Sequence, residues 1–407
     1  MMKNKIDSLI YIVATLAILF LFVTRYIFVG MGIVSGLLLL TAINKRGIHI
    51  PKFILFFLLF IFINIVQYMF FFNDSCIVEV ERNIIYISVI LLLYNIDIEY
   101  DLMLNLWRFM LIFCFAVQII QFFNLYDINN VLVRFYGESD FLRLTTYESI
   151  ASFRSGSIFM SINPYFKFTS VCAALFFYDL TREKNNRTLN YFFIAIAFIS
   201  SLLIGSRTGF LILATIFAVY LISNIGTKFN ARGALTFIGL GFVMTLLIIY
   251  LLSKYQIGEA RFFQTQQTSS FDYKIQMIQL FLDKASWREF IFGMGAYEEN
   301  SGLFMDSDVG YVLSYYGLVG IIVYYIMIFM LVYFKKQLGK FDKALSIMFF
   351  LIIVLGGITS GVYFNYRVFS IILTAVIPFG ALINQSQTRG EKTYFNVGGE
   401  LYDRKKC

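Results

Sequence analysis

Three short segments of the chain join glycine and serine to charged side chains that can bind phosphate or move a proton. They are residues 154–164 (Arg-Ser-Gly-Ser-Ile-Phe-Met-Ser-Ile-Asn-Pro), residues 205–209 (Gly-Ser-Arg-Thr-Gly) and residues 306–320, which begin Asp-Ser-Asp-Val-Gly-Tyr. A planar guanidinium group binds phosphate or carboxylate through paired hydrogen bonds, and a carboxylate can accept the proton of an attacking hydroxyl. The segments therefore indicate chemistry on a phosphate-bearing substrate, which the surrounding elements must hold in place.

The composition shows what kind of element does so. Of the 407 residues, 59% are hydrophobic and 14% are charged, which leaves too little polar surface for a water-soluble globule. A membrane-spanning helix needs about 20 apolar residues, and the sequence predicts an all-α polytopic transmembrane bundle of about 12 spans. The apolar runs lie near 9–24, 26–44, 52–72, 84–96, 106–124, 168–180, 191–205, 209–225, 234–252, 309–334, 344–360 and 368–386. Two of the runs are short, which leaves the count open by one pair.

The basic residues predict the orientation of the bundle. Residues 1–5 are basic and precede an apolar run without a small-residue cleavage site, so they begin a first span rather than a signal peptide. With both termini cytoplasmic, the inner segments carry 13 lysines and 6 arginines, and the outer segments carry 4 lysines and 9 arginines. This excess of positive charge inside is typical of the membrane orientation that we expect.

Two outer connections are long enough to fold over the membrane surface. They are residues 125–167 and 253–308, within a single integral membrane domain of residues 1–407 that ends in a cytoplasmic tail, residues 387–407. In the second loop, apolar residues recur at helical spacing over 271–282, which predicts an amphipathic helix. This helix is either a lid or an element packed on the spans.

Arginine predominates over lysine on the expected outer face. Lysine suits an anionic inner leaflet, whereas the guanidinium fork suits phosphate or carboxylate. Any single outer arginine can equally pair with an outer acid such as Glu148. As a set, they indicate an anion-binding face. The outer arginines are Arg25, Arg82, Arg134, Arg143, Arg154, Arg207, Arg261, Arg288 and Arg367.

Several other classes of protein are excluded by composition. The net charge of +8 belongs to the expected cytoplasmic loops and tail, where it sets orientation rather than binding nucleic acid. The four cysteines are widely scattered, so no disulfide framework or zinc site is indicated. His49 is the single histidine. We therefore expect no nucleic-acid partner and no metal site.

At residues 154–164, 205–209 and 306–320 the chain resembles the bacterial O-antigen polymerase and ligase superfamily, and specifically the Wzy type of polysaccharide repeat-unit polymerase. The motifs cover residues from about 150 to 320, and the rest is similar only in topology. Ligases of this superfamily typically have a histidine at the start of the third motif. Here that place is taken by Asp306, which favours a polymerase over a ligase.

The resemblance implies a membrane glycosyltransferase in the bacterial cytoplasmic (inner) membrane, with its active site facing the periplasm or outside. Such an enzyme transfers a glycan from an undecaprenyl-diphosphate donor to a sugar hydroxyl on a second lipid-linked repeat unit. It thereby polymerises repeat units into O-antigen or a similar surface polysaccharide, without a metal, nucleotide sugar or other cofactor. The implied partners are the lipid-linked glycan donor and acceptor and membrane lipids. A chain-length regulator protein is a further partner that the resemblance leaves open.

The expected catalytic residues follow from this chemistry. Arg207 lies at a junction of two spans, where a lipid headgroup would lie, and would stabilise the charge that develops on the leaving diphosphate; its alternative is snorkelling to the interface. Asp306 and Asp308 are the candidates for the base, although Asp308 can equally be an acid at a helix N-terminus. Tyr363 is either a sugar-stacking or a membrane-interface aromatic residue. The expected substrate-binding residues are Arg143, Arg154, Asn163, Arg261, Arg288, Tyr311, Tyr363 and Arg367.

Two alternatives remain open. One is a ligase of the same superfamily, which hands a glycan to lipid A or protein; the missing histidine argues against it. The other is a flippase or other transporter of lipid-linked oligosaccharide. Transporters usually place ionisable groups at the membrane midplane, often in repeated halves. The clearest charges here lie in outer loops and at span ends, and no repeat is visible, which favours the enzyme.

Overall fold

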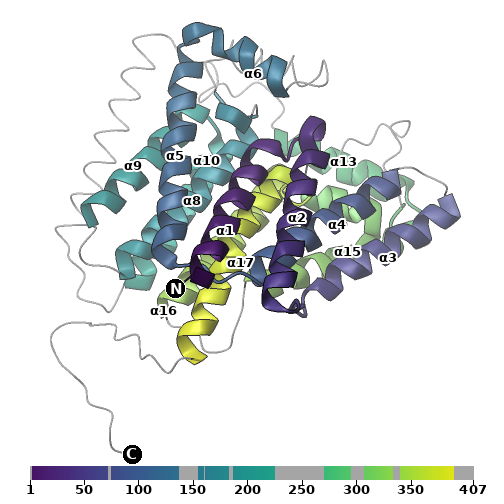
Figure 1. Cartoon of the computed structure of the whole chain (residues 1–407). Helices are drawn as coiled ribbons and strands as arrows, with labels where there is room; N and C mark the ends of the chain where they lie inside the picture. The colour runs from purple at the N-terminus through teal and green to yellow at the C-terminus, as the bar shows by residue number, and fades with distance from the viewer. Residues whose placement is uncertain are drawn as a thin grey trace, which may run out of the picture.

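The computed structural model of the chain describes residues 2–71, 75–136, 155–159, 161–182, 187–224, 270–294, 307–332 and 340–388, and every structural statement below refers to these. This part of the chain is all-α, with fourteen α-helices (Figure 1). They are α1 Met2–Leu21, α2 Ile27–Lys45, α3 Ile54–Phe71, α4 Ser75–Tyr94, α5 Tyr100–Phe122, α6 Ile128–Tyr136, α8 Ile162–Arg182, α9 Arg187–Ile204, α10 Arg207–Asn224, α13 Ser270–Lys284, α14 Trp287–Phe292, α15 Asp308–Val332, α16 Lys340–Thr359 and α17 Tyr366–Thr388. Short 3-10 turns lie at Thr24–Tyr26, Leu125–Asp127 and Ser157–Phe159.

Five helices are long and apolar enough to cross a membrane: α2, α5, α9, α15 and the Asp342–Thr359 part of α16. Shorter apolar stretches occupy parts of α3, α10 and α17. Many large apolar side chains point outward, among them Phe28 and Leu55, as expected where lipid rather than water surrounds a bundle. These features support a polytopic helical membrane protein. The described residues do not establish twelve spans, and the predicted run at 234–252 lies outside them.

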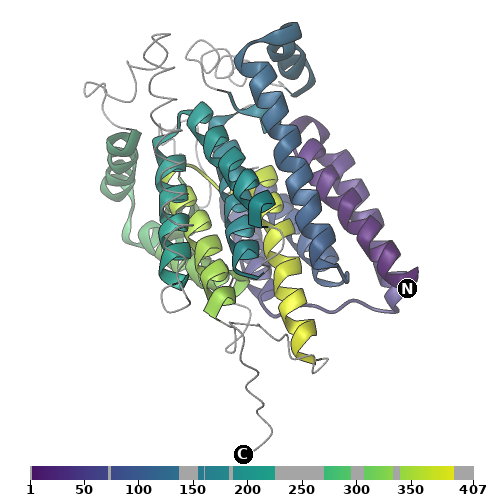
Figure 2. The same ribbon diagram turned by 90° about the vertical axis from the view of Figure 1, so that its left-hand side faces the viewer.

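The long helices lie side by side in one bundle (Figure 1). The start of α1 and the end of α17 lie at its lower end, whereas α6 and α13 lie toward the upper end; Figure 2 shows the same separation from the side. We call this upper end the α6 end. Contacts described below show that α8, α10, α15 and α17 all begin there.

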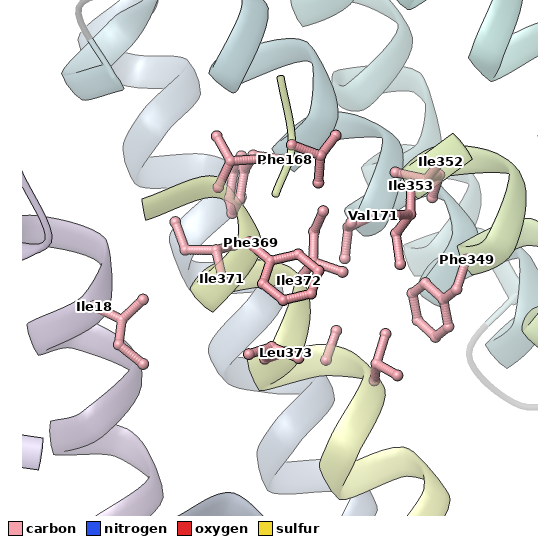
Figure 3. Packing of buried hydrophobic residues seen from close by; sticks show 14 of the residues in the cluster. Ile18, Phe168, Val171, Phe349, Ile352, Ile353, Phe369, Ile371, Ile372 and Leu373 are labelled. Atoms are coloured by element: carbon pink, nitrogen blue, oxygen red, sulfur yellow. The ribbon is translucent and has the colours of Figure 1, made fainter. Parts of the chain in front are cut away.

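Helix α8 lies at the centre of the bundle. It is buried from Tyr165 to Leu180 and packs against α5, α9, α10, α16 and α17. Its Phe168 and Val171 meet side chains of α16 and α17, including Ile352 and Ile372 (Figure 3). The middle of α8 is Ser-Val-Cys-Ala-Ala, and such small residues allow helices in a membrane to approach closely.

Two helices begin earlier than their apolar runs predict. The run at 84–96 belongs to α4, which starts at Ser75, and the run at 168–180 belongs to α8, which starts at Ile162. Both helices have charged residues in their second turns, Glu79 in α4 and Lys167 in α8, which interrupt the apolar pattern without interrupting the helix. Residues 162–167 of the predicted first large loop are therefore helical.

The helix predicted in the second large loop is present as α13. Its Phe281 is fully buried and packs with Tyr311 and Leu313 of α15, so this helix is packed on a span in the described structure. The shorter α14 begins with a capping box between Ser286 and Glu289, which satisfies N–H groups at its start. Together, α13 and α14 cover the beginning of α15.

Helix α15 is interrupted at Gly317, which has φ 64° and ψ −162°. A Cβ atom there would lie 2.4 Å from the Ile291 carbonyl group. The break frees backbone carbonyl groups that must find other donors in an apolar bundle. The Gln67 side-chain amide donates to the backbone carbonyl oxygen of Tyr315 at 2.8 Å, and the Met294 N–H donates to that of Ser314 at 2.7 Å. The break is thus a hydrogen-bonded part of the fold.

We predict that Gly317→Ala lowers the free energy of unfolding by at least about 1 to 3 kcal/mol, because it adds backbone strain to the contact with Ile291. The matched control is Gly36→Ala in α2, since nothing lies within 4 Å of a Cβ atom at that position. Unfolding titrations in mixed detergent micelles compare the two. Equal stabilities of Gly317→Ala and the wild type would contradict the assigned break.

Candidate functional site

A buried lysine holds the connection between α16 and α17 at the α6 end. Lys167 has no exposed surface, and its ammonium group donates to the carbonyl oxygens of Ser360 and Gly361 at 2.6 and 2.5 Å. Burying an ammonium group is costly unless it is paired and hydrogen-bonded. Lys167 therefore orders residues 360–365, which we call the α16–α17 loop.

Asp308 holds the next two residues of the same loop. Its carboxylate accepts the N–H groups of Val362 and Tyr363 at 3.0 Å and the Tyr324 hydroxyl at 2.9 Å. It also attracts Lys167 electrostatically and is 1% exposed. Opposite charges on α8 and α15 thus bind successive carbonyl and N–H groups of one short loop. We call Lys167 and Asp308 the loop clamp.

A pair of glycines in α16 makes room for the clamp. A Cβ atom on Gly356 would lie 3.3 Å from the Lys167 side chain, and one on Gly357 would lie 2.6 Å from the Asp308 carboxylate. Helix α16 therefore passes closely beside both charged groups because these positions lack side chains, and the constraint is tightest at Gly357.

A second charged cluster lies on α4 and α15. The Glu79 carboxylate accepts hydrogen bonds from the Arg82 guanidinium and from the Tyr311 hydroxyl, and Arg82 also donates to the Tyr311 oxygen at 2.8 Å. Glu79 is 1% and Arg82 is 8% exposed. A carboxylate, a guanidinium and a phenol are therefore hydrogen-bonded to one another with little exposure to water. We call these three residues the Glu79 cluster.

Aromatic rings surround the cation of this cluster. The Arg82 guanidinium carbon lies 5.5 Å from the centre of the Tyr311 ring and 5.0 Å from that of Tyr366, distances at which a cation and a ring attract each other. Phe364 lies against Tyr311, with 5.0 Å between ring centres. The cluster thus combines a charge pair with aromatic faces of the kind that can stack on sugars.

Tyr363 connects the loop clamp to the Glu79 cluster. Its N–H is held by Asp308, its hydroxyl donates to the Asn83 side chain at 2.7 Å, and its carbonyl oxygen accepts from the Tyr86 hydroxyl. The side chain is fully buried. Tyr363, predicted to contact substrate or the membrane interface, therefore lies inside the bundle between two polar clusters.

Arg367, which directly precedes the predicted apolar run at 368–386, is the second residue of α17. It is 4% exposed, and it donates to the Leu19 carbonyl oxygen at 2.7 Å and to that of Ile158 at 2.9 Å. Its guanidinium also lies 5.4 Å from the Tyr136 ring centre. Burial raises the pKa of the Tyr136 phenol, while the positive charge of Arg367 acts in the opposite direction. These contacts join α1, α6 and the 157–159 turn to α17.

The second motif forms the start of α10. The Ser206 hydroxyl accepts the Gly209 N–H at 3.1 Å, a side-chain cap of the kind that favours helix initiation. A Cβ atom on Gly209 would lie 2.9 Å from the Phe166 side chain. Arg207 therefore begins a helix whose first turn packs against the first turns of α8, one residue from Lys167.

The remaining predicted residues are distributed unevenly. Asn163 lies part-buried in the first turn of α8, and Arg288 is exposed on α14. Tyr311 belongs to the Glu79 cluster, and Asp308 to the loop clamp. The structure thus brings Asp308, Tyr311, Tyr363 and the start of α10 to one end of the bundle. Arg143, Arg154, Arg261 and Asp306 lie outside the described residues.

Three charged residues of the loop clamp and the Glu79 cluster were not predicted as site residues: Glu79, Arg82 and Lys167. Glu79 and Arg82 are three positions apart, a spacing that pairs side chains on a helix, so this pair was accessible from sequence. Lys167 has partners far along the chain, which no local pattern reveals. Within the described ranges, no group of three or more histidine, cysteine, aspartate or glutamate residues is arranged to hold a metal ion.

Comparison with known proteins finds no matching protein family and no matching curated protein. The function proposed below therefore rests on the residues and geometry of the α6 end.

We predict that Asp308→Asn and Lys167→Met each lower the free energy of unfolding by about 3 to 5 kcal/mol, because each leaves a buried charge without its partner. The double variant should lose less than the sum of the two, since it removes both charges. Unfolding titrations of the four proteins give the coupling free energy. The exposed Asp101→Asn in α5 is the control; strictly additive losses would show that the two charges do not interact.

Proposed function

We propose that this protein is a membrane glycosyltransferase that polymerises undecaprenyl-diphosphate-linked oligosaccharide repeat units into O-antigen or a similar surface polysaccharide. In this proposal the chain spans the bacterial inner membrane about twelve times with both termini in the cytoplasm, and the α6 end faces outward. The reaction is a glycosyl transfer without a metal. The substrates are two lipid-linked glycans, one as donor and one as acceptor.

The observation that carries the proposal is the meeting of the three motif segments at the α6 end. The first motif leads into α8, the second begins α10 and the third begins α15. Gly209 of the second packs on Phe166, which follows the first, and Asp308 of the third holds the same loop as Lys167. Segments far apart in sequence thus gather where α6, α13 and α14 also lie.

This arrangement suits a diphosphate leaving group. The starts of α8 and α10 lie together, and helix N-termini carry partial positive charge that favours anions. Arg207 is the first residue of α10, and an arginine carries a full positive charge at neutral pH. We propose that Arg207 stabilises the diphosphate as the glycosidic bond breaks, with Arg143, Arg154, Arg261 and Arg288 as further contacts to the substrate.

Asp308 has a different part in this proposal from the one expected from sequence alone. Its oxygens accept two backbone N–H groups and a tyrosine hydroxyl, so its donors leave little room for a substrate. We assign it to positioning the α16–α17 loop. Asp306, the other base expected from sequence, lies outside the described residues.

A transporter of lipid-linked oligosaccharide is the second candidate, and the break in α15 favours it. Interrupted helices with buried charges beside them are typical of transporter binding sites, and the Glu79 cluster lies beside this break. The polymerase is preferred because the loop clamp and the Glu79 cluster, with its aromatic rings, both lie at the α6 end of the bundle.

The test is polymerisation by purified protein given the matching lipid-linked repeat unit, with products separated by size. We expect a ladder from the wild type and a rate about 10²-fold lower for Arg207→Ala, because one contact to the developing charge is lost. Arg187→Ala is the matched control, since Arg187 also begins a helix but is exposed at the opposite end.

The outcomes separate the parts of the proposal. An unchanged ladder from folded Arg207→Ala would keep the polymerase and remove Arg207 from its site. Wild-type protein that is folded and supplied with verified substrate, yet makes no ladder, would refute the polymerase. A flipping assay in vesicles would then test the transporter.

A further inference from the structure

Four buried polar atoms beside the α15 break make no hydrogen bond within the described residues. They are Asn64 Oδ1, Gln67 Oε1, Glu79 Oε2 and Arg82 Nε. The Tyr316 hydroxyl also lies near the Glu79 carboxylate. Buried polar groups nearly always have partners. A group of four without any therefore indicates a place that receives water or the polar groups of a ligand.

The connections among these residues place the four atoms around one feature. The Asn64 amide donates to the Tyr316 hydroxyl at 2.9 Å, and the Gln67 amide donates to the Tyr315 oxygen at 2.8 Å. Glu79 binds Tyr311, one turn earlier on α15. Helices α3 and α4 thus direct their polar side chains at the part of α15 that precedes its break.

The atoms define the chemistry of the ligand. Three of them are acceptors and one is a donor, so the group they receive must both donate and accept hydrogen bonds. A sugar hydroxyl does both, and the Tyr366 ring beside Arg82 offers an apolar face for a sugar. The loop helices α13 and α14 cover the same region, because Phe281 packs on Tyr311 and Gln67 also donates to the Phe292 oxygen at 3.3 Å.

The two buried carboxylates described near this end, Glu79 and Asp308, differ in what they can still accept. Asp308 binds backbone N–H groups through both oxygens. Glu79 uses Oε1 for both Arg82 and Tyr311, which leaves Oε2 for another donor. Only Glu79 of the two has an oxygen available for an incoming hydroxyl.

We propose that Glu79 is the catalytic base that receives the proton of the acceptor sugar hydroxyl, while Arg82 and Tyr311 are positioning residues that hold its carboxylate. This inference rests on the proposed function. The hydroxyl proton passes to Glu79 Oε2 as the hydroxyl oxygen forms a bond to the anomeric carbon of the donor. The bond from that carbon to the diphosphate oxygen breaks, and the electron pair leaves with the lipid diphosphate. The proton then passes from Glu79 to solvent.

The first experiment compares the polymerisation rates of wild type, Glu79→Gln and Glu81→Gln with the matching lipid-linked repeat unit. Glutamine keeps the shape of Glu79 and can still accept from Arg82, but it cannot take a proton. We expect kcat to fall about 10²-fold with the donor KM unchanged. Glu81→Gln removes the same charge from the same turn of α4 and should retain the wild-type rate.

A pH profile gives a readout that a purely structural role of Glu79 would not move. The wild-type rate should fall at low pH as the base becomes protonated, and this acid limb should be absent from Glu79→Gln. Tyr311→Phe removes a donor that stabilises the ionised carboxylate, so its acid limb should move to higher pH by about one pH unit. The titratable and charged groups around Glu79 are Cys76, Arg82 and Tyr86 of α4, Tyr311 and Tyr316 of α15, and Tyr363 and Tyr366.

The results separate this inference from the function on which it rests. No ladder from folded wild type overturns the polymerase and the base together. A wild-type ladder with an unchanged rate and acid limb in Glu79→Gln overturns the base alone. If Glu79→Gln does not fold, Tyr311→Phe decides, because an acid limb that stays in place contradicts a base held by that hydroxyl.

Discussion

The need to compensate charge inside an apolar bundle shapes the α6 end. An unpaired ammonium or carboxylate in such surroundings loses several kcal/mol of hydration free energy, so each one must be given partners by the fold. Lys167 and Asp308 obtain theirs from backbone groups of the α16–α17 loop. The loop, in turn, has few other partners for these groups. The same hydrogen bonds therefore satisfy the two buried charges and order the loop.

The α16–α17 loop also holds neighbouring helices in place. Tyr363 is held by Asp308 at its backbone and by Asn83 at its hydroxyl, so the loop clamp also fixes α4 against α17. Tyr366 is the first residue after the loop, and its ring lies beside the Arg82 guanidinium. A group that must meet a substrate within a fraction of an ångström needs such support. The Glu79 cluster is thus held by contacts that reach as far as α8.

The sequence predicted most of the helices because a long apolar run identifies a helix without information about the segments that pack against it. It failed where polar residues continue a helix: α4 begins at Ser75 and α8 at Ile162, ahead of their apolar runs. Glu79 and Arg82 were predictable as a local pair. The contacts of Lys167 were not predictable, because its partners are backbone atoms of a distant loop. Any residue type can supply a backbone carbonyl, so the sequence does not identify such partners. Tyr363 was predicted to stack on a sugar or to lie at the membrane interface, whereas tertiary contacts bury it.

The loop clamp also bears on the order of membrane assembly. Ribosomes deliver Lys167 well before Asp308, so α8 enters the membrane with a positive charge whose partners have not yet been made. Glu79 and Arg82 enter together on one helix and neutralise each other from the start. Helix α4 can therefore insert early and alone, whereas α8 must keep its ammonium near the headgroups until α15, α16 and α17 arrive. Closure around the central helix therefore requires the C-terminal helices.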